Sequence, residues 1–529
     1  MSALAGSRQL VRLASRRDRI VLPIWLYVLI GLVGSSAYSI RGLYPDAQSR
    51  QGLVEAIGAA PAAAAMYGKL VDSSLGAITA WRVGVLGAVL ASVMSIMLIS
   101  RHTRAEEQNG RQELVAAGAI GRYAPLAAAL QLVVAANLLV AVCIGAVAAL
   151  FGLPAAGAFA LGSGIGGCGL FFAGIAAVTA QVAESSRGAN GLAFFALGLF
   201  YLIRAAADMS TYSWLLWCSP VGWFEQVRAF ADERWWVLVL PLLGGVLLVL
   251  LAGYLASRRD YGSGLLPTRP GPEYAGADTR GVFGLAWRLH RGVLAGWMAG
   301  LFIMGAVFGS FAKDIDAFTD SARVRKIMTE LGGGVKNPTD SYLWSIMSVV
   351  GLLAGAYAVS VILRARGEEA AGRAEVVLAG GVGRLRWVLS HLLVAAVGSG
   401  ALLAVAGVGA GLADGLRTHD VPGALGSLLG SALVQWPAVF VVTGFATLLF
   451  GLLPRYANAA WAPLGLFVFL TLIGPELSLG QSALDLSPYS QLPKFPGAQF
   501  DAAPVFWLGA IGLLAAFAGL GALRRRDVG

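Results

Sequence analysis

A polar sequence appears twice in this chain, each time between two long apolar stretches, and it restricts the fold to one with two equivalent halves. Residues 104–122 read RAEEQNGRQELVAAGAIGR, and residues 366–384 read RGEEAAGRAEVVLAGGVGR. Matched positions lie 262 residues apart, so Glu107 corresponds to Glu369. The flanking stretches have diverged much further than this loop. We interpret it as a surface that both halves offer to a twofold partner. The alternative is a solvated loop that survives from a recent duplication.

The apolar stretches predict a membrane protein. The chain is 57% hydrophobic and 13% charged, whereas a soluble protein carries about 25% charged residues. The apolar residues fall in runs of about twenty, the length that crosses a bilayer core roughly 30 Å thick. The sequence therefore predicts an all-α polytopic membrane protein with about twelve transmembrane helices, arranged as two parallel six-helix repeats. The expected spans are 20–40, 81–100, 124–150, 156–182, 191–209 and 235–256, then 292–312, 342–363, 387–413, 426–452, 458–475 and 503–523.

Further landmarks recur in the same order in both halves. Ser219-Pro220 matches Ser487-Pro488, and Arg258-Arg259-Asp260 matches Arg525-Arg526-Asp527. Such ordered matches indicate a tandem duplication. We expect a first permease-like repeat over 1–260, a linker over 261–280 and a second repeat over 281–529. The linker contains three prolines and several glycines, which favour turns.

Positive charge predicts the orientation. Arginines cluster before the first span, in both copies of the repeated loop, in the linker and at the C-terminal end. Because positive residues stay on the cytoplasmic side, both termini are expected there. Both halves then insert in the same orientation, as parallel repeats. Residues 313–340 carry lysines and arginines on the opposite side, but acidic residues offset them.

Several classes of site are not expected. The four histidines show no metal-ligand spacing, and the arginines flank apolar runs rather than forming a nucleic-acid surface. No Gly-x-x-x-x-Gly-Lys-[Ser/Thr] motif occurs. Gly162-Ser-Gly-Ile-Gly-Gly167 matches a dinucleotide fingerprint, but it lies inside an apolar run, where close helix packing explains it. We expect no catalytic residue, metal or cofactor in this chain, and no nucleic-acid partner.

One pair of charges lies within a predicted span. Arg204 and Asp208 are four residues apart, so they can pair on one helix face. The second half has Glu476 at the position of Asp208 but Leu472 at the position of Arg204. Intramembrane charge favours a functional role, here an outer gate or a polar point in a transport path. The alternative is a locally satisfied pair at the end of a helix.

The repeated loop also resembles a known family. Its pattern Glu-Glu-x-x-Gly-Arg-x-Glu-Leu-Val-x-x-Gly-x-x-Gly-Arg resembles the coupling-helix loop of type II ABC exporter permeases, as do the Ser-Pro pair and the final Arg-Arg-Asp of each half. The fused form is most similar to exporters of polyketide antibiotics of the tetronasin type. The resemblance implies that the loops dock onto two copies of a nucleotide-binding ATPase subunit, which holds ATP and Mg. The implied coupling residues are Glu106, Glu107, Gly110, Arg111 and Glu113, with Glu368, Glu369, Gly372, Arg373 and Glu375.

The same resemblance implies the remaining expectations. The fifth and eleventh spans would line a central cavity for a hydrophobic or amphipathic compound, although membrane aromatics also serve as packing residues. Residues 7–19 and 281–291 would be amphipathic elbow helices that contact lipid, with a plain positive anchor as the alternative. The protein would lie in the bacterial plasma membrane. The cavity candidates are Phe194, Phe195, Phe200, Tyr201, Arg204, Asp208, Trp461, Phe467, Phe469 and Glu476.

Two other functional classes compete with an ATP-driven exporter permease. A proton-coupled secondary drug transporter can also have twelve spans in parallel repeats, but it usually needs an acid or histidine relay at the centre of a span. The sequence places none there. An integral-membrane enzyme would need clustered acids, histidines or metal ligands at one face. The only repeated acidic cluster lies in the loop and has no histidine.

Overall fold

The computed structural model describes most of the chain, and the described residues fold into helices. These residues are 3–58, 64, 66–110, 118, 120–210, 212–260, 262–266, 276, 281–312, 337–472, 480–497 and 501–526. Within them, eleven helices are long and apolar enough to cross a membrane, and β structure is limited to one isolated bridge between Ala183 and Leu266. The predicted all-α polytopic fold is confirmed.

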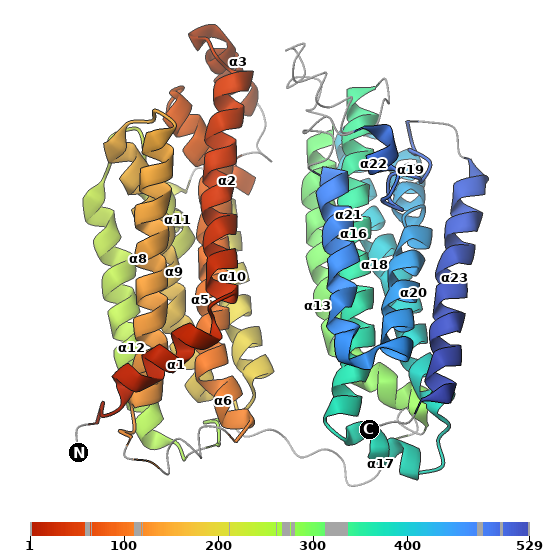
Figure 1. The fold of residues 1–529 in the computed structure, drawn as a ribbon. Coiled ribbons are helices and arrows are strands. Elements are labelled where there is room, and N and C mark those ends of the chain that lie inside the picture. Colours follow the sequence, from red (N-terminus) through yellow and green to blue (C-terminus); the bar gives the residue numbers. More distant parts are fainter. Residues whose placement is uncertain are drawn as a thin grey trace. The chain divides into compact units, whose positions relative to one another are not determined.

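The chain divides into two compact units, Met1–Pro270 and Gly271–Gly529, which we call the first and second halves (Figure 1). In the first half, α9 lies in the middle and packs against α5, α8, α10 and α12. The elements of this half are α1 Ser7–Arg17, α2 Val21–Leu43, α3 Ala47–Gly58, α5 Leu75–His102, α6 Arg104–Gln108, α8 Ala124–Leu150, α9 Ala155–Val182, α10 Ser186–Met209, η1 Ser213–Cys218, α11 Pro220–Gln226, η2 Trp235–Leu238 and α12 Val239–Arg258.

In the second half, α18 packs against α13, α16 and α19, and α20 packs along α23. The elements are α13 Val282–Phe311, α16 Pro338–Ala370, α17 Arg373–Ala379, α18 Arg384–Thr418, α19 Val421–Leu433, α20 Trp436–Leu452, η5 Pro454–Ala460, α21 Trp461–Leu472, α22 Gln481–Leu484 and α23 Ala502–Arg525.

Glycines bring the helices of each half into backbone contact. A Cβ at Gly162 would lie 2.2 Å from the carbonyl oxygen of Ala141, so α8 and α9 can approach only without that side chain. On α20, a Cβ at Gly451 would meet the carbonyl oxygen of Gly519 at 2.1 Å. Small residues drive helix association in membranes in this way. The glycine fingerprint that begins at Gly162 is therefore a packing surface, as predicted.

Three predicted segments differ in detail. The expected span 426–452 is two helices, because Pro437 lacks an N–H and its ring crowds the carbonyl of Leu433, the last residue of α19. Residues 281–291 are not a separate elbow: they form the first turns of the continuous α13, whereas α1 is separated from α2 at Asp18. The predicted span 458–475 begins in the last residues of η5 and continues as α21, and residues 473–479 lie outside the described residues.

The repeated loop lies at one end of each half, which we call the motif end. In the first half, this end collects the C-terminal ends of α5, α9 and α12, the start of α8 and the helix α1 (Figure 1). The other end of each half is called the opposite end.

Candidate functional site at the motif end

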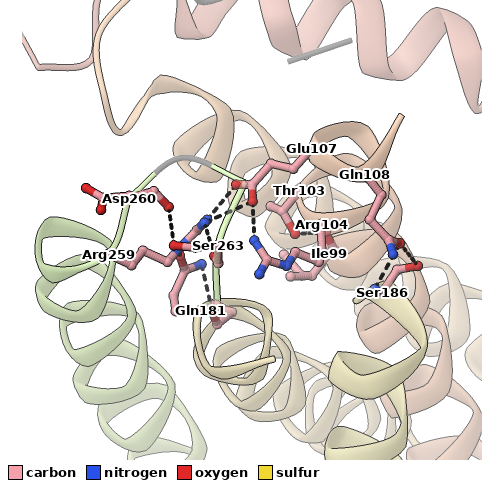
Figure 2. Close-up of polar contacts among 11 residues, drawn as sticks. Ile99, Thr103, Arg104, Glu107, Gln108, Gln181, Ser186, Arg259, Asp260 and Ser263 are labelled. Carbon is pink, nitrogen blue, oxygen red and sulfur yellow. Dashed lines mark hydrogen bonds and ion pairs between the residues drawn. The ribbon is translucent and has the colours of Figure 1, made fainter. Parts of the chain in front are cut away.

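The repeated glutamate of the first half is turned into the protein. Glu107 is the second-last residue of α6, and its side chain is only 6% exposed. Arg259 binds it through two nitrogens: Nη1 donates to Oε2 at 2.9 Å and Nη2 donates to Oε1 at 2.5 Å. Arg104 of the same short helix also pairs with Glu107 (Figure 2). Two parallel charge-assisted hydrogen bonds fix both distance and orientation, so α6 is held to the end of α12.

Arg259 also connects α12 with two other segments. Its Nε donates to Oε1 of Gln181 at 2.7 Å, and its Nη1 donates to the carbonyl oxygen of Ser263 at 3.0 Å (Figure 2). Gln181 is the second-last residue of α9, and Ser263 begins the linker. The linker then runs beside α9, where Leu266 N–H donates to the carbonyl oxygen of Val182 at 2.9 Å. One guanidinium thus joins α6, α9, α12 and the linker.

The second half repeats the arrangement with one change. Arg526 Nη2 donates to Oε2 of Glu369 at 2.8 Å, and the glutamate side chain is 1% exposed. Arg366 lies 3.8 Å from the same oxygen. The other face of Arg526 stacks over the ring of Phe450, 5.1 Å from its centroid. A cation–π contact therefore stands where the first half has a hydrogen bond to Gln181.

The last residue of each repeated loop binds the same helix end. Arg122 Nη2 donates to the carbonyl oxygens of Ala256, Ser257 and Arg259 at 2.9–3.1 Å. Arg384 Nη1 donates to the carbonyl oxygen of Arg526 at 2.7 Å. Carbonyls at a helix C-terminus lack intrahelical partners and favour positive charge. Both ends of the repeated loop therefore bind the C-terminal end of the final helix of each half. We call this set of contacts the clamp.

Other loop residues lie at the surface. Glu106 pairs with Arg17 of α1, and Glu368 accepts from Arg373 Nε at 2.7 Å. Glu375 is exposed on α17, beside Val376, which is 77% exposed.

The glycines of the loop occupy turns that other residues adopt only with strain. Gly110 and Gly372 have φ of +66° and +70°, in the left-handed region. Arg111 and Glu113 lie outside the described residues. Glu107 and Glu369 point inward, whereas Glu375 is exposed, and the coupling role of the loop stays a prediction.

The charges of the fifth span meet a third residue that the sequence did not single out. Arg204 Nη1 lies 3.5 Å from Oδ2 of Asp208 and 2.9 Å from Oε1 of Glu225, and its guanidinium covers the ring of Tyr201 at 4.6 Å. Arg204 and Asp208 pair as their spacing predicts. Glu225 lies on α11, outside the apolar runs, and no sequence signal connects it with α10. Glu476 lies outside the described residues.

A second buried acid anchors α1 in the first half. The Asp18 carboxylate is fully buried and binds Arg101 Nε at 3.0 Å and His102 Nε2 at 2.5 Å, both on α5. Burial acts to raise the pKa of Asp18, but the hydrogen bond and charge of His102, with the charges of Arg101 and Arg17, lower it below its ordinary value. In the second half, His290 and His391 form a buried pair, with Nε2 and Nδ1 3.0 Å apart.

The predicted cavity aromatics divide into two groups. Phe200 and Tyr201 pack inward: Phe200 lies edge-on against Phe171, and Tyr201 OH donates to the carbonyl oxygen of Met66 at 3.3 Å. Phe467 is partly buried against the core of the second half. The rest are exposed on the surface of their own half, by 37–71%: Phe194, Phe195, Trp461 and Phe469.

The described residues contain no group of three or more His, Cys, Asp or Glu side chains that could hold a metal ion. Their polar side chains form ion-pair networks at the ends of helices. These networks join helix ends to one another, as Arg259 joins α6, α9 and α12.

Two comparisons with known proteins agree with this description. A family model described as the C-terminal domain of the multidrug efflux system permease Rv1217c matches residues 280–524. The multidrug efflux system permease protein Rv1217c of Mycobacterium tuberculosis is 41% identical over 534 residues. That alignment covers 100% of this chain and 96% of the relative.

Proposed function

Because the chain belongs to the family of the multidrug efflux system permease Rv1217c, we propose that it is the membrane permease of an ATP-driven exporter whose ATPase is a separate chain. The family and the apolar helices make it a multi-pass permease of an efflux system. One observation supports the ATP-driven mechanism most strongly: the same loop is clamped to the final helix in both halves. Two equivalent, rigidly held loops suit a partner that binds with twofold symmetry.

The clamp gives the partner a mechanical connection to the membrane helices. An ATPase subunit that binds exposed loop residues, such as Glu375 on α17, would displace the loop as it closes on ATP. Because Glu369 holds Arg526 and Arg384 holds the end of α23, that displacement would reach α23 directly. In the first half, Glu107 and Arg122 would pass it to α12. ATP and Mg would remain on the partner subunits.

The substrate would be a hydrophobic or amphipathic compound, as multidrug efflux by the relative implies. Exposed aromatics on α10 and α21 offer area rather than directed hydrogen bonds, which suits ligands of loose shape. Export of a polyketide antibiotic stays a narrower prediction. We place the protein in the bacterial plasma membrane, with its motif ends and both termini in the cytoplasm, because the arginines gather there.

The proposal is tested by affinity purification of the protein from its native membranes, followed by assay of ATP hydrolysis in the eluate. We expect an ATP-hydrolysing chain to co-purify. The double change Glu375→Arg and Val376→Asp should remove it without unfolding the permease, since both side chains are exposed. Glu55→Arg, an exposed acid on α3 at the opposite end (Figure 1), is the matched control and should retain it.

A protein that purifies alone and moves drugs in response to a proton gradient would overturn the proposal. It would favour the proton-coupled secondary transporter instead. Retention of the ATPase by the α17 double variant would overturn the docking role of that helix.

A further inference from the structure

The opposite end of the first half contains a buried arginine between two carboxyl groups. Arg204 Nη1 lies 3.5 Å from Asp208 and 2.9 Å from Glu225. The side chains of Arg204 and Asp208 are fully buried, and that of Glu225 is 14% exposed. With both acids ionised, two carboxylates would lie close together away from most water, which is costly.

Asp208 lacks the hydrogen bonds that a buried carboxylate needs. Both its Oδ1 and its Oδ2 are buried, and neither accepts a hydrogen bond from any described residue. Its neighbours are the guanidinium of Arg204 and the carboxyl group of Glu225, with which it interacts. Two adjacent carboxylates are both acceptors, whereas a proton on one of them provides a donor. Buried carboxyl pairs share a proton for this reason.

We propose that Asp208 and Glu225 form a proton-binding site, which holds one proton in the conformation described here. The proton provides the hydrogen-bond donor that the buried Asp208 oxygens lack. Glu225 is the member nearer to solvent, so it is the route by which the proton enters and leaves.

The titration expected of Glu225 agrees with this geometry. Burial raises the pKa of Glu225 to about 8, with Arg204 acting to lower it and Asp208 acting to raise it. The proton is therefore bound at neutral pH and is released in a mildly alkaline medium.

The other charged and titratable groups around the cluster do not replace the proton. They come from the segment 66–70, from α5, from α10 and from the chain after α11. None of them donates a hydrogen bond to Asp208. These groups are Tyr67, Lys69, Arg82, Tyr201 and Arg228.

The proton site lies beneath a short segment that closes over it. The carbonyl oxygen of Met66 accepts from Tyr201 OH at 3.3 Å and from Arg204 Nη2 at 3.5 Å, and that of Gly68 accepts from Trp81 Nε1 at 2.9 Å. Gly68 has φ +89°, and a Cβ there would lie 2.6 Å from Oε1 of Glu225. Glu225 already reaches solvent, whereas the side chain of Asp208 is fully buried. An ionised pair is stabilised by water, and movement of residues 66–70 would bring water to Asp208, so proton release and opening of this segment favour one another.

The second half lacks two of the three residues of this site. By the 268-residue offset that relates Ser219 to Ser487, the counterparts of Arg204 and Glu225 are Leu472 and Pro493, while that of Asp208 is the acid Glu476. A leucine and a proline neither carry charge nor bind a proton, so the arginine and the carboxyl pair are specific to the first half. The site therefore gives the first half a response to pH that the second half does not share in this form.

Infrared difference spectroscopy of the purified full chain tests the proposal. Between about pH 6 and about pH 10, either side of the value for Glu225, the carbonyl stretch of one protonated carboxyl per chain should disappear. Glu225→Gln and Asp208→Asn should each abolish that change. Asp232→Asn, which alters an exposed acid paired with Arg228, is the control and should leave it intact.

The thermal unfolding midpoint provides a second, independent readout. The folded pKa of Glu225 lies above its unfolded value, so this stabilisation is complete below the unfolded pKa and is lost as pH rises through about 8. The wild-type midpoint should fall over that range, and that of Glu225→Gln should fall less, since an amide cannot ionise. A wild-type spectrum with no titrating carboxyl, or the same titration in both variants, would overturn the site. Neither readout involves an ATPase, so the result stands apart from the proposed function.

Discussion

The motif ends of the two halves contain nearly the same loop but hold it with different chemistry. In the first half, Arg259 donates hydrogen bonds to Glu107, to Gln181 and to the linker carbonyl oxygen of Ser263. In the second half, Arg526 binds Glu369 and stacks on Phe450. The glutamate–arginine contact is common to both, and its surroundings are not. The shared contact therefore explains why the loop sequence is alike in both halves, and the surroundings make its two copies unequal.

The largest effect is expected from removal of the shared arginine. Arg259→Ala should lower the free energy of unfolding by up to about 3–5 kcal/mol, because the buried Glu107 loses its two-nitrogen partner and keeps only the pair with Arg104. Arg526→Ala should cost less than Arg259→Ala, since Arg526 makes fewer hydrogen bonds. Thermal unfolding of the two variants in detergent would compare them. Equal losses would show that the polar surroundings of Arg259 add nothing.

A smaller loss should follow from making the first clamp resemble the second. Gln181→Leu removes the acceptor for Arg259 Nε, and a hydrogen bond to a charged group contributes about 1.5–3 kcal/mol. Leu449 of α20 is the equivalent of Gln181 by the 268-residue offset, and it precedes Phe450. The matched change Leu449→Gln should not raise the free energy of unfolding. A Gln181→Leu variant with the wild-type free energy of unfolding would contradict the role assigned to this amide.

The last arginine of the repeated loop should support the final helix in both halves. Arg122 Nη2 donates to three carbonyl oxygens at the end of α12, and Arg384 Nη1 donates to the carbonyl oxygen of Arg526. A lysine is a point donor and cannot replace a planar guanidinium. Arg122→Lys should therefore lower the free energy of unfolding by about 1 kcal/mol. Chemical denaturation would measure the loss, and an unchanged free energy of unfolding would contradict the role assigned to Arg122.

Acid should loosen the contact between α1 and α5 in the first half. The pKa of Asp18 is lowered in the folded state, so its stabilisation is present above the unfolded value and is lost as pH falls through the folded value. Asp18→Asn should remove part of the acid sensitivity below about pH 4. Glu55→Gln, which alters an exposed acid on the same half, is a control without a buried ion pair. An unchanged acid transition in Asp18→Asn would contradict this account.

The sequence was sufficient for the fold class but not for the contacts that form the site. Hydrophobic run length predicts helices such as Ala124–Leu150 without tertiary information. The break before Pro437 follows from its ring and missing N–H, and the continuity of α13 through residue 291 depends on packing; run length encodes neither. The repeat aligned Arg259 with Arg526, but a linear offset does not say which helix ends meet. Glu225 lies on a short helix between spans, so only the structure brings it to Arg204.

The repeated glutamate is the point at which structure and sequence interpretation differ most. Its recurrence suggested a residue presented to a partner, whereas its burial makes it an internal contact of the clamp. A charge reversal at Glu107 alone would therefore disturb the fold and the partner together. Docking is tested better through Glu375, where a change should alter the free energy of unfolding by no more than about 0.5 kcal/mol.

The most direct test is the charge swap Glu107→Arg with Arg259→Glu, measured by the amount of ATP-hydrolysing chain that co-purifies. Each single variant should be destabilised and should lose the partner. The swap restores the ion pair in reverse, so the account predicts recovery of both the unfolding midpoint and the co-purified ATPase. Recovery of the midpoint with the ATPase still absent would show that Glu107 itself contacts the partner, and would contradict the clamp.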